Sequence, residues 1–242
     1  MAVSASEWTA SASIALEPEN AKPINFAKYA ARIFSIQNLR PSFDDLSIEP
    51  YKSIAFEIYE EFGGKIDALF MFPTSASSLI GIAKGFLHLM DVSRELETAP
   101  RIVAVQTGAI TSIASKLKDS SEPASAPQNG ASQQKSAAGA LGVKVTRRTK
   151  DAVEIIKRLN GAGVIVSPQE IAAADAILRR HGIITSEEGA ASFAGVMRLK
   201  ELKNVVCLLT GRKYEESEEI PGGNLFYAES YTDVKKIGGK LL

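Results

Sequence analysis

A cluster of hydroxyl side chains is the clearest candidate for chemistry in this sequence. The segment PTSASS at residues 73–78 follows an apolar run and precedes a stretch with the pattern of a helix. A strand that runs through a small-residue turn into a helix brings unpaired backbone N–H groups and the positive end of a helix dipole to one point. Hydroxyl groups add donors that suit phosphate, and the turn contains Thr74, Ser75, Ser77 and Ser78. The turn therefore predicts an anion site, and the plainer alternative is that these serines only cap the helix.

The other reactive residues do not show the spacing of a metal site or of a hydrolase. His88 and His181 lack cysteine or acidic partners at metal-ligand spacing, so we expect no metal. Neither Ser192 nor Cys207 has a histidine and an acidic residue arranged around it, as an activated nucleophile would need. The hydroxyl-rich turn therefore remains the leading site.

Charge and composition exclude several classes of function. Lys plus Arg and Asp plus Glu both number 28, so the formal net charge is zero and we expect no nucleic-acid partner. The single cysteine cannot form an intramolecular disulfide, which fits a reducing cytoplasm. The sequence has no run of about 18 apolar residues and no leader-like N-terminus, so we expect neither membrane insertion nor secretion.

The segments around the turn predict a parallel sheet. IDALFMF, at residues 66–72, is a short apolar run without polar alternation, which is typical of a strand covered on both faces by helices. The turn and the helical pattern LIGIAKGFLHLM follow it. The same order recurs in RIVAVQT, at residues 101–107, and GAITSIASKLKD, at residues 108–119. Two adjacent strand, turn and helix units imply parallel strands in an α/β fold.

Further helices and strands follow from periodicity and from start and stop signals. The segment beginning SPQE has Ser167 as N-cap, Pro168 at the first helical position and Glu170 at the third, which predicts a helix ending at Gly182. We also expect helices at residues 24–34, 50–62, 149–161 and 187–202, and strands at residues 163–167 and 204–211. A short extended piece is expected at residues 183–185.

Composition also suggests how the chain divides. Residues 1–45 predict an N-terminal arm with one short helix, and residues 46–242 predict the α/β domain. Within that domain, residues 120–139 are poor in apolar residues and dense in Ser, Ala, Gln and Pro, so we expect a flexible surface loop there.

Several segments, taken in order, resemble one known family. SIEPYKSIAFEIYEEFGG, IDALFMFPTSASSLIGIAKGF, PRIVAVQTGAITSIASKL and SPQEIAAADAILRRHGIITSEEGAASFAGVMRL, followed by NVVCLLTG, are similar to the large domain of threonine synthase and tryptophan synthase β-like enzymes. These are fold-type II pyridoxal-phosphate enzymes, and the resemblance covers about residues 40–212. It implies a parallel three-layer (αβα) sheet with the small domain largely missing, and pyridoxal phosphate as the cofactor.

The resemblance also implies particular cofactor-binding residues. The family's Gly-rich phosphate loop falls on Thr74, Ser75, Ala76, Ser77 and Ser78. Each Cβ there narrows the backbone conformations that glycine would allow. The family's Thr or Ser near the pyridine nitrogen falls on Thr210 at the end of the last strand. A small phosphate-bearing ligand is therefore implied.

One part of the family pattern is absent. No Ser-Phe-Lys-Asp-Arg-like segment, which would supply the Schiff-base lysine, occurs in the sequence. Lys22 and Lys28 lie in the N-terminal region, but neither has the flanking residues of that motif. The family also has an E-P-x-S-A-A pattern, whose Glu and Ser positions fall on Ser186 and Gly189 here. The small residues that pack the helix are therefore kept, whereas the functional Glu and Ser are not. The catalytic residues are left unassigned.

Three hypotheses about function remain open at the level of sequence. The first is a non-catalytic protein of this fold that binds a phosphate-bearing ligand or a partner, with a homo-oligomer or a partner protein covering the face of the missing domain. The second is a divergent active pyridoxal-phosphate enzyme of amino-acid metabolism, a lyase of the threonine synthase type, with its lysine elsewhere or supplied by a partner chain. The third is an ordinary α/β module, although the G-x-G-x-x-G signature of a dinucleotide fold is absent.

Overall fold

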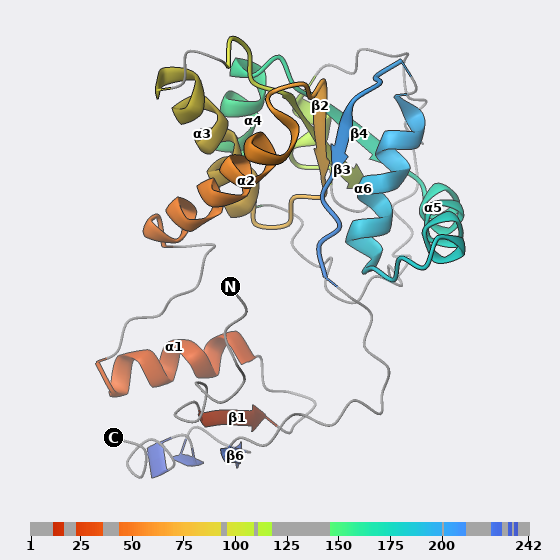
Figure 1. Cartoon of the computed structure of the whole chain (residues 1–242). Helices are drawn as coiled ribbons and strands as arrows, with labels where there is room; N and C mark the ends of the chain where they lie inside the picture. Colours follow the sequence, from red (N-terminus) through yellow and green to blue (C-terminus); the bar gives the residue numbers. More distant parts are fainter. Residues whose placement is uncertain are drawn as a thin grey trace. The chain divides into compact units, whose positions relative to one another are not determined.

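The computed structural model describes ten stretches of the chain, and the predicted flexible loop at residues 120–139 lies outside them. They are residues 12–16, 23–35, 44–92, 96–108, 111–117, 146–199, 201–211, 224–228, 232–233 and 235–236. Contacts divide the chain into two units. One is Arg40–Lys213, and the other joins Met1–Leu39 to Tyr214–Leu242 (Figure 1).

Four parallel strands form the sheet of the larger unit. Their order across the sheet is β4, β3, β2 and β5. The strands are β2 (Ala68–Met71), β3 (Arg101–Thr107), β4 (Ala162–Val166) and β5 (Val205–Cys207). Every residue of β2 and β3 except Arg101 is buried, because these two strands lie in the middle of the sheet with helices on both faces.

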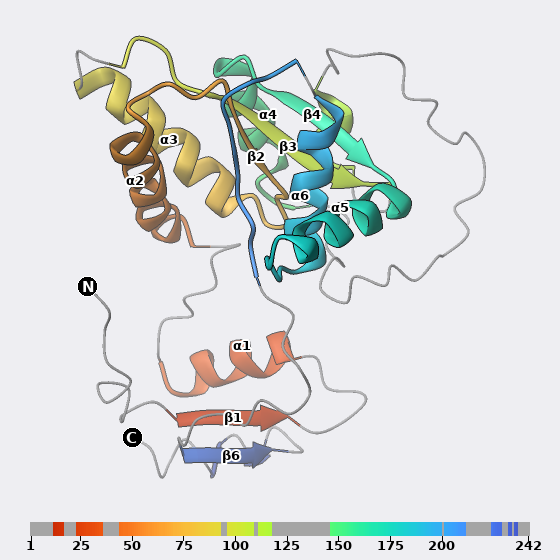
Figure 2. The same cartoon turned by 45° about the vertical axis from the view of Figure 1, so that its right-hand side comes forward.

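Helices cover both faces of this sheet, as Figures 1 and 2 show. They are η2 (Leu46–Tyr51), α2 (Lys52–Phe62), α3 (Ser77–Val92), α4 (Thr149–Arg158), α5 (Pro168–Arg180) and α6 (Glu187–Arg198). Helices α2, α3 and α4 share a core with Leu69 and Met71, whereas α5 and α6 share one with Phe70 and Val103. Alternate strand residues therefore face opposite layers, and the expected parallel three-layer fold is confirmed.

Local signals set the ends of these helices. The Ser167 hydroxyl accepts the N–H of Glu170 at 3.3 Å, while the Glu170 carboxylate accepts the N–H of Ser167 at 2.7 Å. This reciprocal pair is the capping box that the sequence predicts at the start of α5. At the end of α2, Gly63 has a φ of +59°, a left-handed conformation that glycine adopts without strain. Within the described residues, no helix is long and apolar enough to cross a membrane.

The segment after β3 differs from the sequence prediction. Where residues 108–119 predict a helix, the described residues 111–117 contain only the short 3-10 helix η3 (Ala114–Lys116). The buried carboxamide oxygen of Gln106 accepts the N–H groups of Ile113 and Ala114, each at 2.9 Å. A side chain thus satisfies two donors at the start of this turn, and the predicted helix at 108–119 is wrong over the described part.

The strand β5 is shorter than predicted. It spans Val205–Cys207 rather than residues 204–211. The short extended piece expected at residues 183–185 pairs with no strand among the described residues. β5 lies at the edge of the sheet and pairs only with β2 among the described strands. The backbone N–H and C=O groups on its other side therefore have no neighbouring strand in the described part of the sheet.

The smaller unit contains elements from both ends of the chain. β1 (Ala12–Leu16) pairs in parallel with β6 (Asn224–Ala228), and the helix α1 (Pro23–Ile33) lies between them in sequence. The sequence predicted an arm with one helix at residues 1–45, and the structure adds the strand β1 to it. The pairing of β1 with β6 joins residues about 200 positions apart, which no local pattern connects. The predicted division into residues 1–45 and 46–242 stays a prediction.

Candidate functional site

The order of the strands marks one edge of the sheet as the place for a ligand. The chain passes from β2 to β3 and then to β4, each lying farther to one side, and β5 returns to the opposite side of β2. The carboxyl ends of β2 and β5 therefore flank the point where the strand order reverses. Open parallel sheets bind ligands in the crevice at such a switch point.

The hydroxyl-rich turn occupies the carboxyl end of β2 and leads into α3. Ala76 has a φ of +65°, in the left-handed region that favours glycine. The α3 ladder starts here, because the carbonyl of Ala76 accepts the N–H of Ile80 at 3.0 Å. The first N–H groups of an α-helix have no partner within the helix, so this turn presents donors at the positive end of α3.

The predicted side chains of the turn differ in exposure. Ala76 and Ser77 are each 1% exposed, whereas Thr74, Ser75 and Ser78 are half-buried. The hydroxyl of Ser75 donates to that of Ser77 at 3.3 Å and accepts the N–H of Ser77 at 3.5 Å. Ser75 therefore caps the start of α3 in part, as the plainer alternative predicts. Because both hydrogen bonds are long and weak, the Ser75 hydroxyl can also donate to a ligand.

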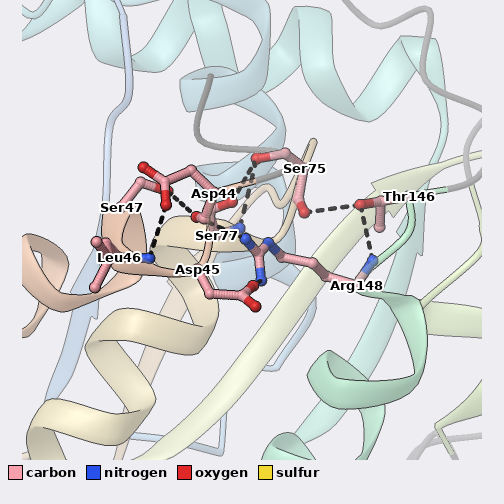
Figure 3. A network of polar contacts seen from close by, with 8 residues as sticks. All are labelled: Asp44, Asp45, Leu46, Ser47, Ser75, Ser77, Thr146 and Arg148. Carbon is pink, nitrogen blue, oxygen red and sulfur yellow. Dashed lines mark hydrogen bonds and ion pairs between the residues drawn. The ribbon is translucent and has the colours of Figure 1, made fainter. Parts of the chain in front are cut away.

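A polar network of Thr146, Arg148 and the acidic pair Asp44 and Asp45 holds the turn in place, as Figure 3 shows. The Thr146 hydroxyl donates to the carbonyl of Ser75 at 2.8 Å and accepts the N–H of Arg148 at 3.3 Å. The guanidinium of Arg148 then reaches the carboxylate of Asp45 at 2.7 Å and the carbonyl of Asp44 at 2.9 Å. Residues from three distant parts of the chain therefore meet at the turn.

Gln106 is a second support that the sequence reading missed. Its side chain is fully buried, and its amide nitrogen lies 3.5 Å from the carbonyl of Pro73, to which it donates. The same carboxamide holds the turn after β3 through its oxygen. A polar residue inside an otherwise apolar strand was the signal that could have identified it.

Thr210 lies at the neighbouring strand end. The ladder between β2 and β5 ends with the N–H of Leu208 donating to the carbonyl of Phe70 at 2.9 Å, so the turn and Thr210 both follow directly. Thr210 is exposed, and its carbonyl accepts a hydrogen bond from the hydroxyl of Ser186. The structure thus brings all six predicted cofactor residues to one edge of the sheet, on adjacent strand ends.

Ser186 and Thr185 bond the segment that follows β5 at this edge of the sheet. Ser186 is the N-cap of α6, where its hydroxyl accepts the N–H of Gly189 at 3.2 Å. The carbonyl of Gly211 accepts the N–H of Ser186 at 3.2 Å and the hydroxyl of Thr185 at 3.3 Å. Gly211 has a φ of +78°. A capping serine therefore occupies the position where the resemblance would expect a glutamate.

Thr107 adds an unsatisfied group at the same edge. Its residue is 8% exposed at the carboxyl end of β3, and its hydroxyl oxygen has no hydrogen-bond partner within the described structure. Buried hydroxyls without a partner are costly, and they concentrate at functional sites or where a ligand or water completes them. Hydroxyl donors thus follow β2 and lie at the ends of both neighbouring strands, β3 and β5, and such donors fit a phosphate-bearing group.

The remaining reactive residues do not form a second catalytic site. Burial raises the pKa of Cys207 to about 12, so its thiol stays protonated and unreactive at neutral pH. His88 on α3 faces the ring of Phe56, with the ring centroids 6.0 Å apart. Across the described stretches, no group of three or more His, Cys, Asp or Glu residues could hold a metal ion.

A hollow at the opposite edge of the sheet is a poorer candidate. This cavity of about 540 Å³ lies at the amino ends of the strands and includes Asp67, Arg101 and Lys203 in its lining. Asp67 uses its carboxylate to accept the N–H groups of Lys203 and Asn204 at 3.0 and 2.9 Å. The guanidinium of Arg101 donates to the carbonyl of Asn160 at 3.0 Å. Because two of its charged side chains already bond neighbouring backbone groups, this hollow is the weaker candidate.

Comparison with known proteins gives one family match. Residues 14–211 match the family model described as pyridoxal-phosphate dependent enzyme. No curated protein sequence matches the chain.

Solved structures share the fold at low sequence identity. A pyridoxal 5'-phosphate-dependent aspartate racemase has a TM-score of 0.58 and 15% identity, with 85% of this chain and 68% of that protein covered. Serine racemase from Dictyostelium discoideum has a TM-score of 0.57 and 16% identity, covering 84% and 68%. A threonine deaminase from T.th. has a TM-score of 0.56 and 16% identity, covering 83% and 64%. The chain spans from 53% to 68% of the length of such structures.

Proposed function

Because the chain belongs to the pyridoxal-phosphate dependent enzyme family, we propose that it binds the phosphate of pyridoxal phosphate at the carboxyl ends of β2 and β5. We further propose that this chain, taken alone, acts as a ligand-binding member of the family and does not catalyse a reaction. The two parts of the proposal rest on different observations.

The turn at residues 73–78 is the observation that carries the binding proposal. It joins four hydroxyl side chains to the N-terminus of the sixteen-residue helix α3, at the switch point of a parallel sheet. A phosphate dianion would be stabilised there by hydroxyl donors, by N–H groups and by the helix dipole. The buried, unpaired hydroxyl of Thr107 at the same edge is independent support.

Each side chain has a defined part in this proposal. Pyridoxal phosphate supplies an electron sink for amino-acid chemistry when it is bound. Ser75 and Ser78 would donate to its phosphate, and the exposed hydroxyl of Thr210 would lie on the β5 side, where the family resemblance places a partner of the pyridine nitrogen. Ser186 caps α6 and holds the carbonyl of Thr210, so it would orient that segment.

The absence of a recognisable lysine segment supports a non-catalytic role for this chain. No Ser-Phe-Lys-Asp-Arg-like segment occurs in its sequence. Neither Lys22 nor Lys28 has the residues that flank the family's lysine. Without that lysine, the group that forms the Schiff base and moves protons in this family would be missing from this chain.

Within the family, we propose the threonine synthase type as the relationship of this chain. The order of the matching segments and the strand NVVCLLTG support this assignment. O-phosphohomoserine and related phosphorylated amino acids are then the second ligand class to test, since the hydroxyl-rich turn would accept their phosphate as well.

Equilibrium titration of the full chain tests the binding proposal. Pyridoxal phosphate and pyridoxal differ only in the phosphate, so we expect the phosphorylated form to bind at least tenfold more tightly. A Ser75→Ala, Ser78→Ala double variant is expected to remove most of that difference, because it deletes two hydroxyl donors. Ser53→Ala, an exposed serine on α2, is the matched control. Equal affinity for both probes would refute the phosphate site.

Reduction with borohydride tests the non-catalytic part. We expect peptide mass spectrometry of the reduced complex to find no lysine that carries a pyridoxyl group. A single modified lysine, formed in stoichiometric yield, would favour the divergent active enzyme instead.

A further inference from the structure

Thr146 and Arg148 connect the phosphate turn to two distant segments, and neither residue belongs to the predicted site. We propose that Thr146, held by the buried Arg148, is a positioning residue that fixes the turn in a phosphate-binding conformation. This inference rests on the proposed phosphate site and adds the residues that organise it.

The hydroxyl of Thr146 is fixed from two directions. It donates to the carbonyl of Ser75 at 2.8 Å and accepts the N–H of Arg148 at 3.3 Å, and the residue is only 5% exposed. A hydroxyl has one proton to donate, so the bond from Arg148 leaves that proton directed at Ser75. Thr146 therefore holds one carbonyl of the turn in a set direction.

Arg148 anchors Thr146 to the segment that precedes η2. Its side chain is 6% exposed, and it bonds the carboxylate of Asp45 and the carbonyl of Asp44. Figure 3 shows the guanidinium lying between these acidic residues and the turn. Asp45 is 91% exposed, so the pair adds modest electrostatic stability, but two hydrogen bonds from one planar group fix the position of Arg148.

The carbonyl of Ser75 matters because of the next residue. It shares a planar trans peptide with the N–H of Ala76, so fixing the carbonyl also fixes the opposite direction of that N–H. Ala76 has a φ of +65°, which is unfavourable for alanine and needs support from its surroundings. A left-handed residue next to a helical one is the backbone pattern of anion-binding nests. The bond from Thr146 thus stabilises the conformation that a phosphate would need.

Three variants of the full chain separate positioning from general stability. Thr146→Val removes the hydroxyl at constant shape, and Thr146→Ser keeps it. Ser192→Ala is the matched control, because the Ser192 hydroxyl is equally buried and donates to a backbone carbonyl, that of Glu188 within α6 at 2.9 Å, without a bond to Thr146 or Arg148. Each variant is titrated with pyridoxal phosphate and with pyridoxal.

The expected result is specific to the phosphate. Thr146→Val should weaken pyridoxal phosphate about fivefold to tenfold and leave pyridoxal unchanged, because only the phosphate uses the turn. Thr146→Ser should stay within about twofold of the parent, and Ser192→Ala should leave the ratio of the two affinities unchanged. A loss shared equally by both probes, or an equal loss in Ser192→Ala, would overturn the proposal.

Hydrogen exchange in the absence of ligand keeps this test separate from the proposed function. We expect Thr146→Val to speed exchange at the N–H groups of residues 76–80 and Thr146→Ser to restore it. Unchanged exchange in Thr146→Val overturns the positioning role even if the parent binds phosphate. If the parent binds neither probe but exchange responds as expected, the proposed ligand is wrong and the positioning of the turn stands.

Discussion

At the scale of single residues, the site depends on an alanine in a conformation that suits glycine. Replacing Ala76 by Gly removes strain of about 1–2 kcal/mol, but it also loses a buried methyl group and gives the unfolded chain more freedom. Because these effects oppose one another, we expect the free energy of unfolding to change by less than about 1 kcal/mol.

The same substitution should improve ligand binding. Without a Cβ at residue 76, the backbone can approach a phosphate more closely, so we expect Ala76→Gly to bind pyridoxal phosphate several-fold more tightly than the parent. Urea unfolding and ligand titration measure the two quantities independently. Unchanged binding by Ala76→Gly would contradict a contact between the turn and the phosphate.

Cys207 should be chemically inert in the folded protein. Burial raises its pKa to about 12, so at pH 8 much less of this thiol is ionised than of an ordinary thiol. We expect alkylation by iodoacetamide to be at least about tenfold slower than that of the urea-unfolded chain. A rate that matches the unfolded chain would mean that β5 opens readily to solvent.

At the scale of elements, the capping box of α5 gives a prediction about stability. Ser167→Ala removes the hydroxyl that accepts the N–H of Glu170, and we expect a loss of about 1 kcal/mol in the free energy of unfolding. Ser53→Ala, on the exposed side of α2, should change it by less than about 0.5 kcal/mol. Denaturant melts of both variants provide the comparison, and equal losses would contradict the role of the cap.

The same element predicts a dependence on pH. Burial opposes ionisation of Glu170, but hydrogen bonds from Ser167 and Arg198 outweigh it, so the pKa of this carboxyl lies below its usual value. A lowered pKa in the folded state adds stability above the unfolded-state pKa and loses it as pH falls through the folded-state pKa. We therefore expect Glu170→Gln to flatten the decline of melting temperature below about pH 4.5. An unchanged acid decline would contradict the shift.

The sequence predicted the elements whose signals are local. The apolar runs of β2 and β3 and the caps of α5 each lie within a few neighbouring residues, and the structure places these elements as expected. It could not predict that Gln106 would take two backbone donors from the segment after β3, or that Thr146 would hold Ser75 across 71 positions. Such bonds depend on tertiary distances, for which a single sequence has no periodic pattern.

At the scale of the whole molecule, the division into two units predicts independent folding. Unit Arg40–Lys213 contains the complete four-stranded sheet and both of its hydrophobic cores. We expect residues 40–213, expressed alone, to unfold in one cooperative transition at a melting temperature close to that of the full chain. Non-cooperative melting of this fragment would mean that the strands β1 and β6 are needed for the sheet to form.

Association of the chain with a second copy or with a partner protein stays a prediction. Five large apolar side chains are exposed among the described residues, and Ile183 and Ile184 are adjacent, at 40% and 50%. Sedimentation of the full chain over a range of concentrations measures its mass directly. A monomer at all concentrations would leave a different protein as the remaining candidate.

The most direct test of the central claim is where pyridoxal phosphate binds. Backbone amide NMR of the full chain, titrated with this compound, reports each N–H group separately. We predict that the largest shifts fall on residues 76–79, with smaller ones at Thr107 and Thr210. Shifts centred on Asp67 and Lys203 at the opposite edge of the sheet, or no shifts at all, would contradict the proposed site.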